Sequence, residues 1–198
     1  TKMKASQILC LLVLVCVVNA SSRMLLDFNR YSILSFRWFE VSDTVREEGQ
    51  SFAVIATQQT QTTKRAVFFS LLNPLPNGAA FASRHRKVWW NLSHYTHLKI
   101  NLRAQGESKR YSIVLEAQNQ DNSYQTFFTL PNEEFQDVLF PLDQFVAIVR
   151  GVPDPDAPPL NTARLREFGF RIAGGVFLPV KQSGPASLEI NTVEAVTI

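Results

Sequence analysis

The chain has 198 residues, of which 45% are hydrophobic and 19% are charged, and its formal net charge is +3 at pH 7. A chain of this length can bury a sufficient hydrophobic core without covalent cross-links, and it favours a single domain. A charge so close to zero argues against a general nucleic-acid binder, which needs clustered Lys and Arg to displace counterions.

The N-terminal segment is predicted to be a signal peptide spanning residues 3–20. A basic start at Met3-Lys4 precedes the apolar run 8–18, which is too short to span a bilayer. Ala20 supplies the small residue that a signal peptidase requires, so the mature domain is expected to cover residues 21–198. A retained anchor and a mitochondrial transit peptide are the alternatives, although a transit peptide is typically amphipathic and rich in Arg and Ser.

Cleavage at this site changes both the charge and the cysteine content. Lys2 and Lys4 leave with the signal peptide, so 18 basic groups against 17 acidic groups give +1. Cys10 and Cys16, the only two cysteines, also lie within it. We therefore expect a mature domain without disulfides and without a stable membrane anchor.

Short segments with period-two alternation dominate the chain from residue 51 onward, which is typical of half-buried strands. Phe52, Val54 and Ala56 alternate with small or polar neighbours, and residues 57–64 form a polar turn. Residues 66–72 are apolar on both faces, which predicts a central strand.

Turn residues separate the later strands. The segment 73–78 carries two prolines and an Asn-Gly pair, so it is expected to end one strand and begin another at Ala79. Residues 98–103 and 111–116 flank a turn and predict a hairpin. Further strands are predicted at 124–130, 136–142, 166–172 and 187–196. About eight to ten strands at this spacing indicate an all-β sandwich or jelly roll.

Two polar segments are predicted to be surface loops. The basic run 84–87 is interpreted as a solvated loop. Residues 151–162 contain four prolines, which stiffen a segment that cannot pair in a central strand. This rigid loop is the candidate binding surface, with Asp154, Asp156, Pro158 and Pro159 as the candidate contact residues.

The sequence lacks recognisable catalytic and cofactor motifs, including a nucleophile elbow, a phosphate-binding loop and a dinucleotide fingerprint. Asp43, Glu47 and Glu48 provide carboxylates for a hydrolase alternative, but no partner group lies nearby in the sequence. A turn in which Asp43 accepts hydrogen bonds from backbone amides is favoured. The sequence therefore predicts no enzymatic activity and no cofactor.

Two further patterns are weak candidates for metal ligands. His94 and His97 precede a strand, where residues three apart point to opposite faces, so solvated or capping histidines are favoured over a metal site. Asp154 and Asp156 are two residues apart, but they lack the spacing of a known calcium loop, and an ordinary turn is favoured. No metal site is predicted.

Asn91-Leu92-Ser93 forms an N-glycosylation sequon, which requires entry into the secretory pathway to be used. If residues 89–91 are extended, Trp89 and Asn91 share the outer side and Trp90 faces the core. We therefore predict a glycan on Asn91, a buried Trp90 and a partly exposed Trp89.

A series of short motifs runs in a fixed order from about Leu25 to the C-terminus: residues 26–28, Trp38, 41–43, 66–72, 77–84, 91–95, Tyr111, 124–128, 140–145, 150–160, 169–170 and 188–190. The order and spacing of these motifs resemble the complex I intermediate-associated protein 30 domain. The resemblance implies a galactose-binding-like β-sandwich without enzymatic activity. It also implies binding of carbohydrate or protein, and the mitochondrial member of the family assists assembly of respiratory complex I.

Two hypotheses for function follow. The first is a binding module of the secretory pathway whose partner is a protein or a glycan. The second is a chaperone-like assembly factor for mitochondrial complex I. The sequence predicts no nucleic-acid partner, and it does not indicate the oligomeric state.

Overall fold

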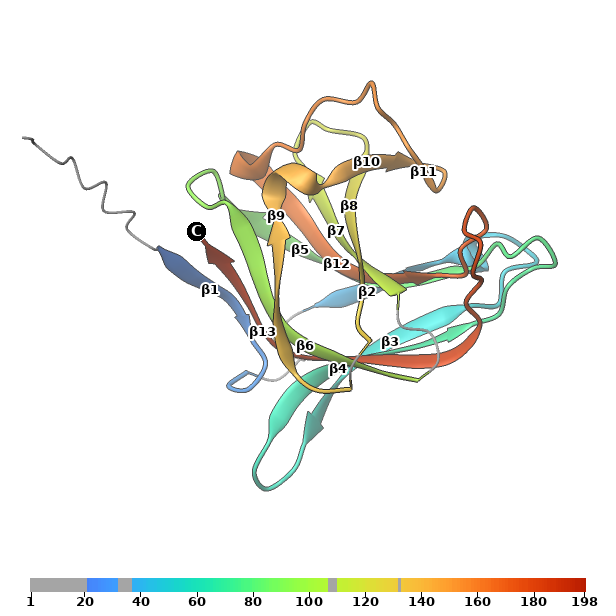
Figure 1. Ribbon diagram of the computed structural model, residues 1–198, viewed down its shortest axis with the longest axis horizontal. Helices are drawn as coiled ribbons and strands as arrows, with labels where there is room; N and C mark the ends of the chain where they lie inside the picture. Colours follow the sequence, from blue (N-terminus) through green and yellow to red (C-terminus); the bar gives the residue numbers. More distant parts are fainter. Residues whose placement is uncertain (1–20, 32–36, 107–109, 132) are drawn as a thin grey trace, which may run out of the picture.

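The computed structural model describes residues 21–31, 37–106, 110–131 and 133–198. The predicted signal peptide, with its two cysteines, lies outside these residues. In the described part the chain forms thirteen strands and no α-helix. The strands form two antiparallel sheets that pack face to face (Figure 1). The prediction of an all-β sandwich is confirmed.

The first sheet is organised around the long C-terminal strand. This strand, β13, pairs with β6 along one edge, while β4 and then β1 share its other edge. The strands of this sheet are β1 (Ser22–Asp27), β3 (Phe52–Gln59), β4 (Lys64–Leu72), β6 (His97–Gly106), β9 (Gln136–Pro141) and β13 (Gly184–Val196).

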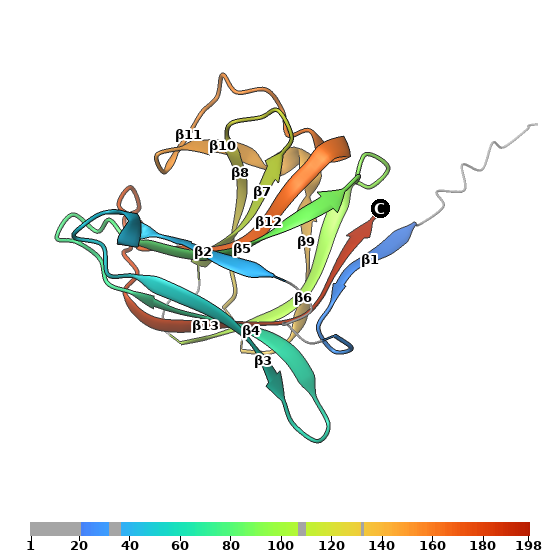
Figure 2. The ribbon, with the colours of Figure 1, turned by 180° about the vertical axis from the view of Figure 1, so that it is seen from behind.

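The second sheet has seven strands in the order β11-β10-β8-β7-β12-β5-β2. Figure 2 shows it from behind, with β2 at one edge and β10 and β11 at the other. Its strands are β2 (Trp38–Ser42), β5 (Phe81–Trp90), β7 (Arg110–Ala117), β8 (Ser123–Thr129), β10 (Val146–Val149), β11 (Val152–Pro153) and β12 (Leu165–Ala173). Short 3-10 helices are η2 (Asp43–Val45), η3 (Leu142–Gln144) and η4 (Thr162–Arg164).

The hydrophobic core lies between the sheets and follows the predicted period-two pattern. Alternate residues of β6, including Ile100 and Leu102, are inaccessible to solvent. On the second sheet, the rings of Phe168 and Phe170 lie 5.0 Å apart, and the ring of Trp90 lies 5.3 Å from Phe168. Each fully buried side chain of this size stabilises the fold by about 1.5–3 kcal/mol.

The strand predicted around residue 52 exists, but its faces are reversed. Phe52 and Val54 point outward and are 40% exposed, whereas Ala53 is fully buried. The backbone of Ala53 explains the reversal, because its N–H donates to Glu40 at 3.1 Å and its carbonyl accepts from Arg84 Nε at 2.7 Å. These polar side chains need room between the sheets, which a small residue provides. The strand also continues to Gln59, so the predicted turn 57–64 is shorter.

The prediction of a solvated loop at residues 84–87 is wrong, because this run forms the middle of β5. Arg84 points between the sheets and reaches the backbone of β3. His85 points to the other side and is buried. The charged residues of this run suggested a loop, because the groups that pair with them lie on segments far away in the sequence.

The carboxylate of Asp43 holds two segments of backbone together. It accepts hydrogen bonds from the N–H of Ser51 at 2.9 Å and of Phe81 at 3.2 Å. Gly49 packs so closely that a Cβ there would lie 2.0 Å from the Asp43 carbonyl oxygen. The expectation that Asp43 accepts hydrogen bonds from backbone amides is confirmed, but only one of the two amides is near it in the sequence, because Phe81 lies 38 residues away at the start of β5.

Candidate functional site

The outer face of the second sheet carries a row of side chains that crosses five strands. Phe39 lies opposite His85, which lies opposite Gly169. The row continues through Val114 on β7 to Gln125 on β8. These positions point away from the core because side chains alternate along a strand. At the usual distance between strands, the row is about 19 Å long.

Polar residues on this outer face are almost completely shielded from solvent. His85 is 4% exposed, Glu167 is 4% and Gln125 is 2%, although no other sheet formed by the described residues covers them. Neighbouring side chains and loops therefore provide the cover. Ser112 Oγ donates to Gln125 Oε1 at 3.2 Å, so part of this polar surface is internally hydrogen-bonded.

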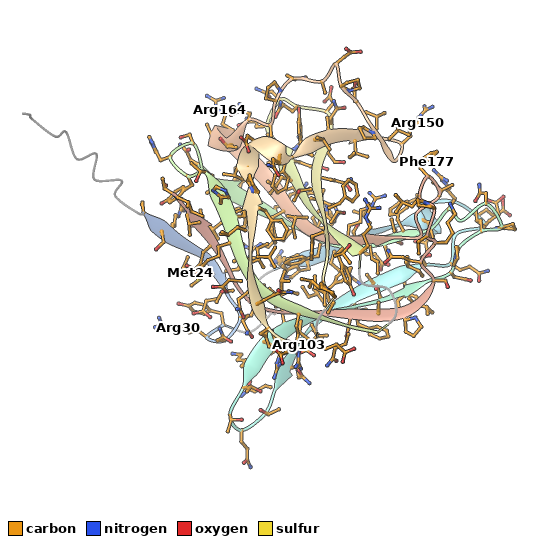
Figure 3. All side chains as sticks on the ribbon, in the orientation of Figure 1. Met24, Arg30, Arg103, Arg150, Arg164 and Phe177 are labelled. Carbon is orange, nitrogen blue, oxygen red and sulfur yellow. The ribbon has the colours of Figure 1, made fainter. Side chains whose placement is uncertain are left out.

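Two loops meet at one border of this face. A Cβ at Gly151, in the turn between β10 and β11, would lie 3.6 Å from Cε2 of Phe177. Phe177 belongs to the segment between β12 and β13, and its side chain is 67% exposed. Figure 3 shows Phe177 close to Arg150 at this border.

A hydrogen-bonded network centred on Glu167 occupies the floor of the face. The carboxylate of Glu167 lies 2.6 Å from His85 Nδ1 and also pairs with the ammonium group of Lys87. Burial raises the pKa of Glu167, but the hydrogen bonds from His85 and Lys87 outweigh this effect and hold the pKa below its ordinary value. The buried carboxylate is thus kept ionised by two partners.

Ser83, His85 and Glu167 lie in the order of a hydrolase triad, with Ser83 Oγ 2.9 Å from His85 Nε2. The hydroxyl of Ser83, however, donates its single proton to the carbonyl of Val41 at 2.6 Å. Its oxygen can then only accept from Nε2, so His85 is not placed to remove a proton from it. Ser83 is also 0% exposed and out of reach of a substrate. The arrangement holds the face together structurally.

In the part of the chain that the structure describes, one group of three potential metal ligands occurs, formed by His85, Glu116 and Glu167. Their ligand atoms lie within 4.8 Å of one another. The two carboxylates already pair with cations, because Lys87 contacts Glu167 and Arg166 lies 3.3 Å from Glu116. This charge balance supports the network without an ion.

Gly169 makes the close packing of this network possible. A Cβ at this position would lie 2.8 Å from Cδ2 of His85 and 3.0 Å from the carbonyl oxygen of Arg84. The imidazole therefore occupies the space where any other residue would place its side chain.

Aromatic side chains surround the polar floor. Phe39 is 36% exposed, Phe127 is 42% and Trp89 is 84%. Lys87 Nζ lies 5.2 Å from the ring centroid of Phe39, and the guanidinium of Arg110 lies 4.8 Å from that of Phe127. The face thus combines exposed aromatic planes with hydrogen-bonding groups.

Two hollows on the surface are lined by neither His85 nor Glu167. The larger, of about 670 Å³, is lined by the β3–β4 turn and by Arg65, Arg103 and Phe135. Figure 3 labels Arg103 on the outer side of the first sheet. Both guanidiniums pair with Glu189, at 2.6 and 3.0 Å. The smaller, of about 220 Å³, is lined by Trp89, Asn91 and the segment 163–166.

The candidate binding loop, residues 151–162, crosses the top of the molecule in Figure 1, but it is not loop throughout, because Val152 and Pro153 form the short edge strand β11. Asp156 and both Pro158 and Pro159 are exposed, and Asp154 is half-buried. The N–H of Asp156 donates to Asp154 Oδ1 at 3.2 Å, as in an ordinary turn.

The loop is fastened to the second sheet at its second half. Tyr124 donates to the carbonyl of Pro158 at 2.6 Å, and Gln120 Nε2 donates to that of Pro159 at 2.9 Å. This loop and the His85–Glu167 network are separate features of the structure. The network was not predicted from the sequence. Its only trace in the sequence is a run of charged residues within the segment that forms β5.

The sequon has the exposure that a glycan requires. Asn91 is exposed, and its Oδ1 accepts from the N–H and the hydroxyl of Ser93 at 3.0 and 2.7 Å. Trp90 is 9% exposed and Trp89 is 84% exposed, so the predicted register is confirmed. His97 Nδ1 lies 2.7 Å from the hydroxyl of Thr96, and the backbone carbonyl of His94 accepts a hydrogen bond from the hydroxyl of Thr197 at 3.0 Å.

No helix among the described residues has the length and apolar character needed to cross a membrane.

Comparison with solved structures identifies the fold. The family 11 carbohydrate-binding module of a cellulosomal cellulase of Clostridium thermocellum superposes with a TM-score of 0.62 at 12% identity. The superposition covers 90% of this chain and 95% of that module. The same module, solved with a β-1,3-1,4-mixed-linked tetrasaccharide, gives 0.62 at 13% identity, with 89% and 95% covered. The predicted galactose-binding-like jelly roll is confirmed.

Sequence comparison identifies the family. An uncharacterized protein of Schizosaccharomyces pombe is 28% identical over 171 residues, which cover 79% of this chain and 76% of that protein. Residues 26–190 match the complex I intermediate-associated protein 30 profile, which includes every strand of the second sheet and most of the first. The chain therefore belongs to the complex I intermediate-associated protein 30 family.

Proposed function

We propose that this chain is a non-catalytic binding module that takes a glycan on the outer face of the second sheet. The observation that carries the proposal is the pairing of exposed aromatic planes with polar side chains that solvent reaches, the exposed Lys87 beside Phe39 and the half-buried Arg110 beside Phe127. Sugars present apolar C–H faces and a rim of hydroxyls, which match aromatic rings and fixed hydrogen-bonding groups respectively. The row of about 19 Å across the sheet suits an oligosaccharide better than a single sugar.

The comparisons support this proposal through the fold. The carbohydrate-binding module of Clostridium thermocellum, solved with a tetrasaccharide, shares the architecture over nearly the whole chain. Fold alone does not establish function, so the argument rests on the side chains of the outer face. Shielding of Ser83 within its own network favours binding over hydrolysis.

Titration of the purified chain with neutral β-linked glucan oligosaccharides tests the proposal. Replacing Trp89 or Phe127 by Ala is expected to weaken binding about tenfold, since one aromatic contact contributes about 0.5–1.5 kcal/mol beyond its buried area. Phe69→Ala is the matched control, because Phe69 is 39% exposed on the first sheet. Equal losses in all three variants, or no binding by the parent chain, would contradict the proposal.

The family favours a second candidate, a chaperone-like factor for the assembly of respiratory complex I. In that case the partner is a protein, and we propose the loop 151–162 as its contact surface. The hydrogen bonds to Pro158 and Pro159 hold this loop in one conformation, which lowers the entropy cost of binding.

Capture of partners from native extract tests the loop. Replacing Asp154 and Asp156 by Ala is expected to reduce capture while the fold survives, since exposed loops tolerate change. The Trp89→Ala variant serves as the comparison. Capture that is lost with Trp89→Ala and unchanged by the loop substitutions would assign the contact to the outer face of the second sheet.

A further inference from the structure

Arg171 occupies the centre of the outer face of the second sheet. It lies on β12, opposite Ser83 of β5 on one side and Ser112 of β7 on the other. Its guanidinium lies 4.2 Å from the ring centroid of Phe81. Burial lowers the pKa of Arg171 to about 10, so the side chain remains a cation at neutral pH while it has lost much of its hydration.

Among the described residues, no carboxylate pairs with Arg171. Other arginines of the two sheets do have such a partner: Arg65 and Arg103 contact Glu189, and Arg84 contacts Glu40. A half-buried cation usually pairs with an anion, because desolvation is otherwise uncompensated. Arg171 instead has an aromatic ring, which offsets only a part of that cost.

Arg110 repeats this arrangement on the neighbouring strand. It points to the same face, its guanidinium stacks on Phe127 at 4.8 Å, and no carboxylate of the described residues pairs with it. β7 and β12 are adjacent, and Ile172 lies opposite Tyr111, so Arg171 and Arg110 are diagonal neighbours. Two cations on aromatic platforms therefore lie side by side.

The acidic groups that share this face are already neutralised. Glu167 pairs with His85 and Lys87, and Glu116 pairs with Arg166. The charges remaining near Ser83 and Ser112 are therefore positive.

We infer that Arg171 and Arg110 form a subsite for the carboxylate of an acidic saccharide. A guanidinium presents a planar fork that matches a carboxylate with two parallel hydrogen bonds. Phe81 and Phe127 hold the two guanidiniums and offer adjacent apolar surface for the sugar ring. This inference rests on the proposed glycan function and adds a preference for uronic acids over neutral sugars.

The experiment compares a short oligomer of galacturonic acid with its fully methyl-esterified form, which has the same length and no charge. The parent chain is expected to bind the acid about tenfold more tightly at moderate salt. Arg171→Gln and Arg110→Gln should each remove this preference, and Arg171→Lys should retain only part of it. Arg23→Gln, on the exposed strand β1 of the other sheet, is the matched control and should behave as the parent.

The outcomes separate this inference from the proposed function. Equal binding of acid and ester, or binding of neutral glucans alone, would overturn the subsite and leave the glycan function intact. Binding of no saccharide would overturn both. Equal competition by a short poly-glutamate peptide would show that the arginines recognise acidic peptide and would overturn the saccharide assignment. Thermal unfolding of each variant confirms that it is folded, and Arg110→Gln provides an independent test if Arg171→Gln is unstable.

Discussion

Gly169 is the one position in the central row of the second sheet where the absence of a side chain is required. The Gly169→Ala substitution places a methyl group 2.8 Å from the His85 ring and 3.0 Å from the backbone carbonyl of residue 84. The ring can shift, but the carbonyl is fixed by strand pairing. We expect the free energy of unfolding to fall by about 1–3 kcal/mol, as for other overpacked sites, and denaturant titration measures it.

A double-mutant cycle with His85→Ala separates the two contacts. If most of the steric clash is with the His85 ring, Gly169→Ala should lower the free energy of unfolding less in the His85→Ala background than in the parent chain. Additive effects would show that the imidazole does not fill the space above Gly169.

The free energy of unfolding is expected to depend on pH through Glu167. The pKa of this carboxyl in the folded chain lies below its ordinary value of 4.5. Its ionised form therefore stabilises the fold above that value, and the contribution is lost as the pH falls through the folded pKa. Glu167→Gln should cost about 3 kcal/mol at pH 7, because His85 and Lys87 lose a buried partner. Below pH 4.5, the difference in the free energy of unfolding between the parent chain and Glu167→Gln should become smaller.

Urea titrations at several pH values measure this dependence. Glu47→Gln, at an exposed position in the turn after η2, is the control and should follow the parent curve. Parallel curves for the parent and Glu167→Gln throughout the acid range would show that this carboxylate does not contribute to acid sensitivity.

At the scale of elements, β5 shows how a strand divides its side chains between core and surface. Trp90 packs on Phe168 between the sheets, whereas Trp89 is almost fully exposed. Trp90→Ala should lower the free energy of unfolding by about 3–5 kcal/mol, and Trp89→Ala should change it by about 0.5 kcal/mol or less. Thermal and chemical denaturation distinguish the two variants. A larger loss from Trp89→Ala would mean that the register of β5 is wrong.

Much of this architecture follows from alternation in the sequence. Strands such as β6 and β7 were predictable because their apolar residues recur every second position. The middle of β5 was predicted to be a loop because Arg84 and His85 are charged or polar, although both sides of this strand are largely buried. The reversed faces of β3 were not predictable either, because Ala53 is buried through hydrogen bonds to residues on β2 and β5.

At the scale of the molecule, the candidate site brings together segments that are far apart in the chain. His85 and Glu167 are separated by 82 residues, yet their side chains are hydrogen-bonded. No local pattern connects them, because only the antiparallel pairing of β5 with β12 makes them neighbours. The loop 151–162 could be predicted because its prolines are a local signal. The outer face of the second sheet required the complete topology.

The compartment in which the chain functions is testable through Asn91. This side chain is exposed, lies next to the smaller hollow and is followed by Ser93, whose hydroxyl donates to Asn91 Oδ1. We propose that a chain entering the secretory pathway is glycosylated there and begins at Ser21. Expression of the full chain with a C-terminal tag should then give a mass shift that a glycosidase removes and that Asn91→Gln abolishes.

Two further measurements distinguish the secretory pathway from mitochondria as the compartment of the chain. N-terminal sequencing of the product locates the cleavage site, and imaging of the tagged chain reports its compartment. Asn73→Gln is the control, because Asn73 is exposed but followed by Pro74 and lacks the sequon. A glycan on Asn91 would exclude mitochondrial import for that pool of protein, because glycosylation takes place in the secretory pathway. An unglycosylated chain in mitochondria would instead support the assembly-factor candidate and remove the secretory interpretation of residues 3–20.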